Sequence, residues 1–147
     1  MILTALTRTA ATIALSISAL ALVNCAGGPS YAEAKSTLPP IAKGKGRVFV
    51  YRPSSIGMAI RPTVKINGKE ENTSYAQGFF YSDQTPGNHK ISIKTEWNHE
   101  NTFSVKAGQP SFVKCRVMPG VLVGHFIPNQ VDTATGEEEI QDCKLAE

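Results

Sequence analysis

The feature that most constrains the fold of this chain is an alternation of apolar and polar residues, punctuated by turn dipeptides, from Arg47 onward. Val64 and Ile66 share one parity, for example, and Asn67-Gly68 follows immediately. A period of two places successive side chains on opposite faces of a β-strand. Asn-Gly favours a type I′ hairpin turn, because both central residues of that turn need positive φ. The sequence therefore predicts β-hairpins that each bury one face.

The same pattern predicts short strands along the rest of the chain, at residues 47–51, 60–66, 69–72, 79–81, 89–95, 102–106, 113–117 and 121–127. Seven to eight such strands without a long helical pattern are typical of an all-β, antiparallel β-sandwich of the immunoglobulin type. Closure into a barrel is the alternative. Residues 121–127 are nearly continuous in apolar side chains, which predicts a central strand. A short helix is expected at 137–142, with Thr135 as its cap.

The first 24 residues have the pattern of a secretory signal peptide, expected as an N-terminal helix. Arg8 is the one charged residue before position 33, and residues 10–23 form an apolar run of 14 residues. A transmembrane helix needs about 20 apolar residues, so this run has the length of a signal-peptide core instead.

The motif Leu22-Val23-Asn24-Cys25 resembles the lipobox of bacterial lipoproteins, with Asn24 in the place of the usual small residue. The resemblance implies lipidation of Cys25 and cleavage before it. Ordinary secretion with cleavage after Ala34 is the rival interpretation, and a buried structural cysteine at position 25 is the third. Ala26 stands where an Asp would favour the inner membrane, so the expected location is the cell envelope, with an outer-membrane anchor facing the periplasm.

Three segments are expected: a signal peptide at 1–24, a flexible tether at 25–46 and a β-sandwich domain at 47–147. Gly27-Gly28-Pro29 and Pro39-Pro40 interrupt the periodicity of the middle segment, which predicts a linker. Removal of residues 1–24 takes one of the 15 basic residues and none of the 12 acidic ones, leaving 14 against 12, a net charge of +2. A balance this small argues against a nucleic-acid partner.

Two cysteines, Cys115 and Cys143, remain once Cys25 is acylated. Cysteine pairs in an oxidising compartment usually form disulfides, so a Cys115–Cys143 bridge is expected, with free structural thiols as the alternative. A hydrolase with Cys115 as nucleophile and His125 as base is the catalytic alternative, but no orienting acid or oxyanion donor is apparent. The histidines do not have zinc-ligand spacing, so no metal and no cofactor is expected.

Several motifs resemble the envelope lipoproteins of the domain of unknown function family 2846. They are residues 46–53 (GRVFVYRP), 61–69 (RPTVKINGK), 79–81 (FFY) and 86–89 (PGNH). The middle stretch also resembles PEGA-type surface modules, which have V-x-I-N-G-K followed by P-G-x-H. The resemblance covers about Gly46 to Leu145 and implies a β-sandwich on a lipid anchor. It carries no functional residue over to this chain.

The function expected from these features is that of a non-enzymatic, membrane-anchored binding or structural module of the cell envelope. An envelope protein or a cell-wall glycan is the expected partner, bound through loops at one end of the sandwich or by strand addition at an edge. The alternatives are the Cys115/His125 hydrolase and a periplasmic enzyme inhibitor that acts through the loop 54–59.

Overall fold

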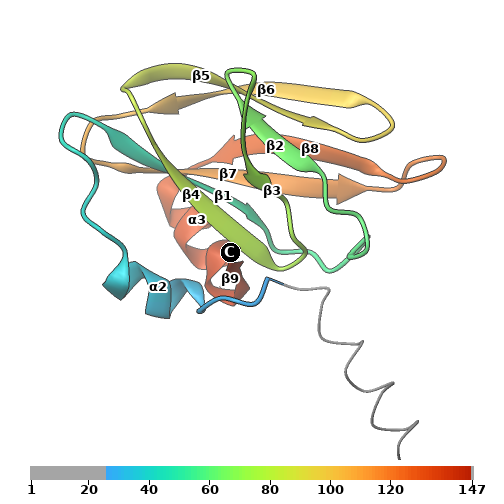
Figure 1. Ribbon diagram of the computed structural model, residues 1–147, viewed down its shortest axis with the longest axis horizontal. Coiled ribbons are helices and arrows are strands. Elements are labelled where there is room, and N and C mark those ends of the chain that lie inside the picture. The colour runs from blue at the N-terminus through green and yellow to red at the C-terminus, as the bar shows by residue number, and fades with distance from the viewer. Residues whose placement is uncertain (1–25, 147) are drawn as a thin grey trace, which may run out of the picture.

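The computed structural model describes residues 26–146, which form two β-sheets and one layer of helices (Figure 1). The predicted signal helix and Cys25 lie outside the described residues. The strands are β1 Gly46–Arg52, β2 Thr63–Ile66, β3 Lys69–Thr73, β4 Gly78–Gln84, β5 Gly87–Lys94, β6 Asn98–Val105, β7 Pro110–Met118, β8 His125–Val131 and β9 Lys144–Leu145. The helical elements are α2 Tyr31–Thr37, α3 Thr133–Glu139 and the 3-10 turn η2 Ile140–Asp142.

The predicted all-β sandwich is confirmed, with nine strands in the described part of the chain. One sheet has the order β8-β7-β1-β4-β9 and the other the order β3-β2-β5-β6. Most strand pairs are antiparallel, as expected, but β1 pairs in parallel with β7, and β4 in parallel with β9. Alternation within a strand carries no information on the direction of its neighbour, and these partners are distant in sequence.

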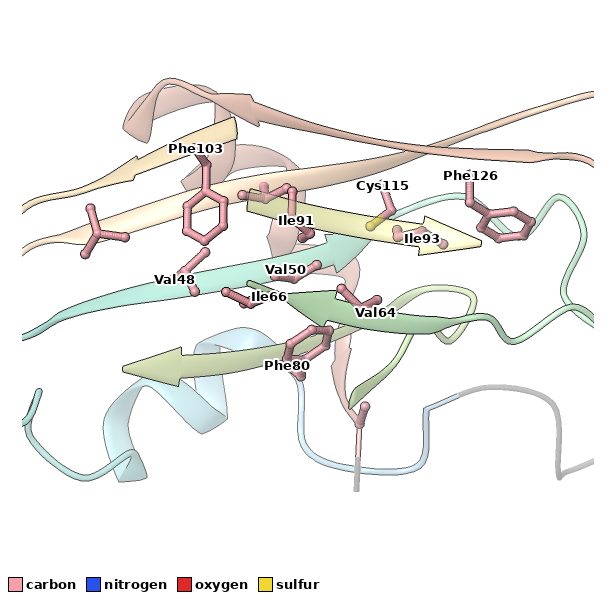
Figure 2. Packing of buried hydrophobic residues seen from close by; sticks show 13 residues of the cluster. Val48, Val50, Val64, Ile66, Phe80, Ile91, Ile93, Phe103, Cys115 and Phe126 are labelled. Carbon is pink, nitrogen blue, oxygen red and sulfur yellow. The ribbon is translucent and has the colours of Figure 1, made fainter. Parts of the chain in front are cut away.

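The space between the two sheets is filled by the inward-facing parity of both (Figure 2). Val48 and Val50 of β1 belong to the same hydrophobic cluster as Ile91 and Ile93 of β5. Phe103, Cys115 and Phe126 belong to the same cluster. Each of these side chains is at most 2% exposed. The alternation read from the sequence therefore identifies the sandwich core.

A second hydrophobic cluster covers the outer face of the five-stranded sheet. It consists of the opposite parity of that sheet together with residues from the helices: Tyr31, Ala34, Phe49, Tyr51, Phe79, Phe112, Ile140 and Cys143. Figure 1 shows α2 and α3 on this side of the sheet. Both faces of β1 are thus buried, which explains why its two parities are both apolar.

The expected flexible tether at 25–46 is wrong for the described residues 26–46. Helix α2 lies in this segment and buries Tyr31, whose ring packs edge-on against Phe49 and Phe79 at centroid distances of 5.4 and 5.5 Å. Ser30 and Glu33 form a capping box at the start of the helix. This S-x-x-E signal was present in the sequence, but the surrounding glycines and prolines obscured it.

The predicted central strand at 121–127 is also wrong. Residues 121–123 are an exposed bend, and β8 begins at His125 and forms one edge of the five-stranded sheet. The apolar run spans a loop tip at residues 121–123 and the start of the strand β8. Composition alone does not separate the two.

A short C-terminal helix is present, but it begins earlier than expected. Asp132, rather than Thr135, is the N-cap of α3, and its carboxylate accepts a hydrogen bond from the Thr135 amide at 3.0 Å. The 3-10 turn η2 then leads into β9. Within residues 26–146, no helix has the length and apolar character needed to span a membrane.

Candidate functional site

Three connections meet at one end of the sandwich, and we call them the apolar loop end: residues 53–62, 95–97 and 119–124. β1 ends at Arg52 and β7 runs parallel to it, so the connections that follow these two strands leave the sheet at the same end. The turn after β5 reaches the same place, because Thr95 Oγ1 donates a hydrogen bond to the Gly124 carbonyl at 2.7 Å. The loops 95–97 and 119–124 are therefore in contact, and the loop 53–62 leaves the sandwich at the same end.

Large hydrophobic side chains are exposed at this end of the molecule. Val121 is 88% exposed, Leu122 87% and Trp97 64%. Every large exposed hydrophobic residue of the described chain lies in these loops or directly beside them: Ile56, Met58, Trp97, Met118, Val121, Leu122 and Val123. At the opposite end the connections at 67–68, 85–86 and 106–109 are mostly polar or small. Exposed apolar side chains gathered at one end of a domain are typical of an interaction site.

The loop 53–62 is held in place by a buried arginine. Arg52 is 1% exposed, and its guanidinium donates hydrogen bonds to the carbonyls of Ile56, Gly57, Ile60 and Ser74 at 2.7–3.1 Å. The guanidinium also lies over the Phe126 ring, 4.7 Å from its centroid. Arg52 thus fixes the path of the loop from inside while Ile56 and Met58 point outward into solvent.

A carboxylate holds the loop 119–124 in a similar way. Glu96 accepts hydrogen bonds from the backbone amides of Leu122 and Gly124 at 2.8 Å, and from that of Val123. These amide donors lower the pKa of Glu96 to about 2. The carboxylate is therefore ionised at neutral pH, and its charge orders a loop whose side chains face water.

Behind the loops, two histidines on facing strands make contact. His99 Nε2 and His125 Nδ1 are 2.9 Å apart, and their rings meet edge to face. His89 is remote from this pair and bonds to Asn67 and to the Thr85 carbonyl. Among the described residues, no group of three or more metal-ligating side chains gathers, and the His99–His125 contact was not foreseen from the sequence.

The expected Cys115–Cys143 disulfide is wrong, because both thiols are free and face different clusters. Cys115 lies inside the sandwich, whereas Cys143 packs on the helix-covered face of the five-stranded sheet. The C-terminal tail is instead held by hydrogen bonds, from the Lys144 amide to the Gln77 carbonyl and from the Ala146 amide to the Phe79 carbonyl. Sequence spacing does not reveal the sheet that separates the two cysteines.

The structure does not bring Cys115 and His125 together either. On the β7–β8 ladder Cys115 is opposite Pro128, and His125 is opposite Met118, three positions away. Three residues of strand span about 10 Å, which is too far for a proton transfer. Burial raises the pKa of the Cys115 thiol to about 12, although Ser74 and Arg52 beside it act in the opposite direction.

We expect neither described cysteine to react with iodoacetamide while the protein is folded. Cys115 is 1% exposed and Cys143 0%, and burial raises the pKa of both thiols to about 12. After denaturation without a reductant, both should be alkylated, which mass spectrometry of the two peptides measures. Crosslinked Cys115 and Cys143 peptides in the denatured, unreduced sample would contradict the structure.

The sequence interpretation missed Arg52 and Glu96, the two residues whose side chains hold the loops of the apolar loop end in place. Arg52 has the parity of the inward-facing Val48 and Val50, which was the available signal of its burial. The run Val121-Leu122-Val123 is enclosed by Gly120 and Gly124, and this flanking was the signal of a loop tip. A contact such as that between Glu96 and this loop, 26 residues away, has no sequence signal.

Comparisons with known proteins identify a family but assign no chemistry. The sequence profile of the family described as protein of unknown function (DUF2846) matches residues 42–125, more than half of the 147 residues and the part that contains the three loops. A Haemophilus influenzae protein described as uncharacterized is 31% identical over 135 residues, which are 91% of this chain and 80% of that protein. No solved structure matches significantly. The chain belongs to the family of proteins of unknown function DUF2846.

Proposed function

We propose that this protein is a lipid-anchored, non-enzymatic binding module of the bacterial cell envelope, held at Cys25 on the outer membrane and facing the periplasm. The observation that carries the proposal is the apolar loop end, on which the exposed hydrophobic side chains of the described chain are concentrated. A rigid sandwich that presents such loops is built to contact another component rather than to perform chemistry.

The anchor at Cys25 is supported by the position of helix α2. The rival cleavage site, after Ala34, falls inside α2, which spans Tyr31–Thr37. Cleavage there would remove Tyr31 from the outer cluster, where its ring contacts Phe49 and Phe79. Cleavage before Cys25 leaves the whole helix in place. Two or three acyl chains on Cys25 would then hold the protein stably, since each buried methylene contributes about 0.8 kcal/mol.

The non-enzymatic part of the proposal is supported by the environment of Cys115. A nucleophilic cysteine needs an accessible thiolate and a base within hydrogen-bonding distance. Cys115 is buried in the sandwich core, and His125 bonds to His99 instead. This geometry disfavours the hydrolase hypothesis.

A cell-wall glycan remains one candidate partner, because a polar groove of about 760 Å³ crosses the outer face of the four-stranded sheet. Thr63 and Lys65 of β2, with Ser92 and Lys94 of β5, line the groove. Together with Glu70, which pairs with Lys65 at 3.5 Å, these hydroxyl and ammonium groups can hydrogen-bond to the hydroxyls and carboxylates of a glycan. An envelope protein is the other candidate.

Metabolic labelling with palmitate tests the anchor. We expect the wild-type protein to carry the label and to sediment with membranes, whereas Cys25→Ser removes the label and releases the protein into the soluble fraction. Asn24→Gly is the matched control at the neighbouring position and should keep both properties. An unlabelled wild-type protein whose amino terminus is Lys35 would refute the proposed anchor.

A further inference from the structure

The beginning of the described chain lies at the same end of the sandwich as the apolar loops. Ala26 is 5% exposed and packs against Gly78, the first residue of β4. Gly78 is the cross-strand partner of Arg52, the residue from which the loop 53–62 departs. In Figure 1 the blue start of the described chain lies below the five-stranded sheet, close to the end of the domain from which the β7–β8 connection extends.

Ala26 is also fixed to the domain rather than separated from it by a linker. The Gly28 amide donates to the Leu145 carbonyl at 3.1 Å, and the Leu145 amide donates to the Pro29 carbonyl at 2.9 Å. Consecutive Cα atoms are about 3.8 Å apart, so Cys25 is within one residue of a fixed point on this end of the sandwich. Acyl chains on Cys25 would therefore hold this end of the domain directly at the membrane surface.

We propose that the apolar loop end is a membrane-docking surface, which inserts its exposed side chains into the bilayer that holds the acyl chains of Cys25. This inference rests on the proposed lipid anchor and names the lipid surface as what the loops contact. Val121, Leu122 and Ile56 supply apolar side chains, and Trp97 is of the residue type that favours the membrane interface. The opposite end of the domain, with the connections at 67–68, 85–86 and 106–109, stays free to face the periplasm.

The charges at the loop end suit a lipid surface. The sequences of the three loops contain one acidic residue, Glu96, whose carboxylate is already bonded to the backbone amides of the loop 119–124. Arg61 lies in the loop 53–62 and stacks near the Tyr75 ring, 5.5 Å from its centroid. Lys94 and Arg116 are exposed on the strands that lead to the other two loops. Cations around an apolar centre complement anionic headgroups around acyl chains.

The chain contains one tryptophan, so Trp97 reports on this surface without labelling. The purified, acylated full-length protein is reconstituted into vesicles of phosphatidylethanolamine and phosphatidylglycerol. We expect acyl-brominated lipids to quench Trp97 fluorescence, because bromine in the acyl region reaches an inserted ring. We expect aqueous iodide to quench Trp97 about threefold less than a reporter at the far end of the domain.

That reporter is Ala107→Trp in a Trp97→Phe background, since Ala107 is exposed in the connection between β6 and β7. The double substitution Val121→Ser/Leu122→Ser should abolish quenching by brominated lipid without unfolding, because both side chains face solvent. It should leave the protein on the vesicles through Cys25.

The outcomes separate the two proposals. A purified protein that carries no acyl chain and does not float with vesicles refutes the anchor. An acylated, vesicle-bound protein whose Trp97 is open to iodide and is not quenched by brominated lipid overturns the docking surface alone. That result would assign the loops to a protein partner instead.

Discussion

Arg52→Met is expected to lower the free energy of unfolding by about 3–5 kcal/mol, because it removes the guanidinium donors of one buried and three partly buried backbone hydrogen bonds. The guanidinium of Arg52 donates to four backbone carbonyls, those of Ile56, Gly57, Ile60 and Ser74. Methionine fills much of the same volume but donates no hydrogen bond. Urea denaturation monitored by circular dichroism measures the loss.

Two further variants show whether hydrogen bonding is responsible for this loss. Arg52→Lys keeps the charge but cannot reproduce the planar fork of donors, so most of the loss should remain. Arg116→Met is the matched control, since Arg116 is exposed on β7, and its effect should stay within about 0.5 kcal/mol. An Arg52→Met protein as stable as the wild type would show that the four carbonyls do not depend on this side chain.

Gly136→Ala is expected to lower the free energy of unfolding by about 1–3 kcal/mol, even though alanine is the better helix former. Gly136 is buried in α3, and a methyl group at this position would overlap the ring of Phe112. Phe112 is itself fully buried and stacks on Phe49 at a centroid distance of 5.4 Å. The ring therefore has little room to move, and the helix must shift outward from the sheet. Thermal and urea denaturation measure the change.

The sign of the change in free energy of unfolding on Gly136→Ala shows whether α3 is packed against the sheet. If α3 were not packed against β7, removing a glycine from a helix would stabilise it by about 0.5–1 kcal/mol. Gly27→Ala is the matched control, because no atom lies within 4 Å of the added carbon, and it should have little effect. A stabilised Gly136→Ala protein would contradict the docking of α3 on the five-stranded sheet.

The strands were largely predictable because their signal is local. β5 is an example, where Ile91 and Ile93 face the core and Ser92 and Lys94 do not. The hairpin at Asn67-Gly68 was predictable for the same reason, since its turn needs two residues that tolerate positive φ, and both have it. Their pairing into two separate sheets required contacts between distant strands.

The wrong predictions of a flexible tether and of a Cys115–Cys143 disulfide have a common physical origin. Both depend on contacts between parts of the chain that meet only after folding. Helix α2 is stabilised because the ring of Tyr31 packs against the rings of Phe49 and Phe79, which lie 18 and 48 positions later in the sequence. The two cysteines remain unpaired because a sheet lies between them. Neither the contacts of Tyr31 nor the separation of the two cysteines can be read from the residues that neighbour them in the sequence.

The sequence by itself determined most of the strands, several of the turns and many of the side chains that face the sandwich core, because those properties depend on residues within one or two positions. Only the tertiary structure decided that β1 lies parallel to β7, that Arg52 supports a loop from inside and that Ala26 lies at the same end as Leu122. Burial and proximity of that kind arise from contacts across the chain, and the free energy of such contacts exists only once the two sheets and the helices have packed.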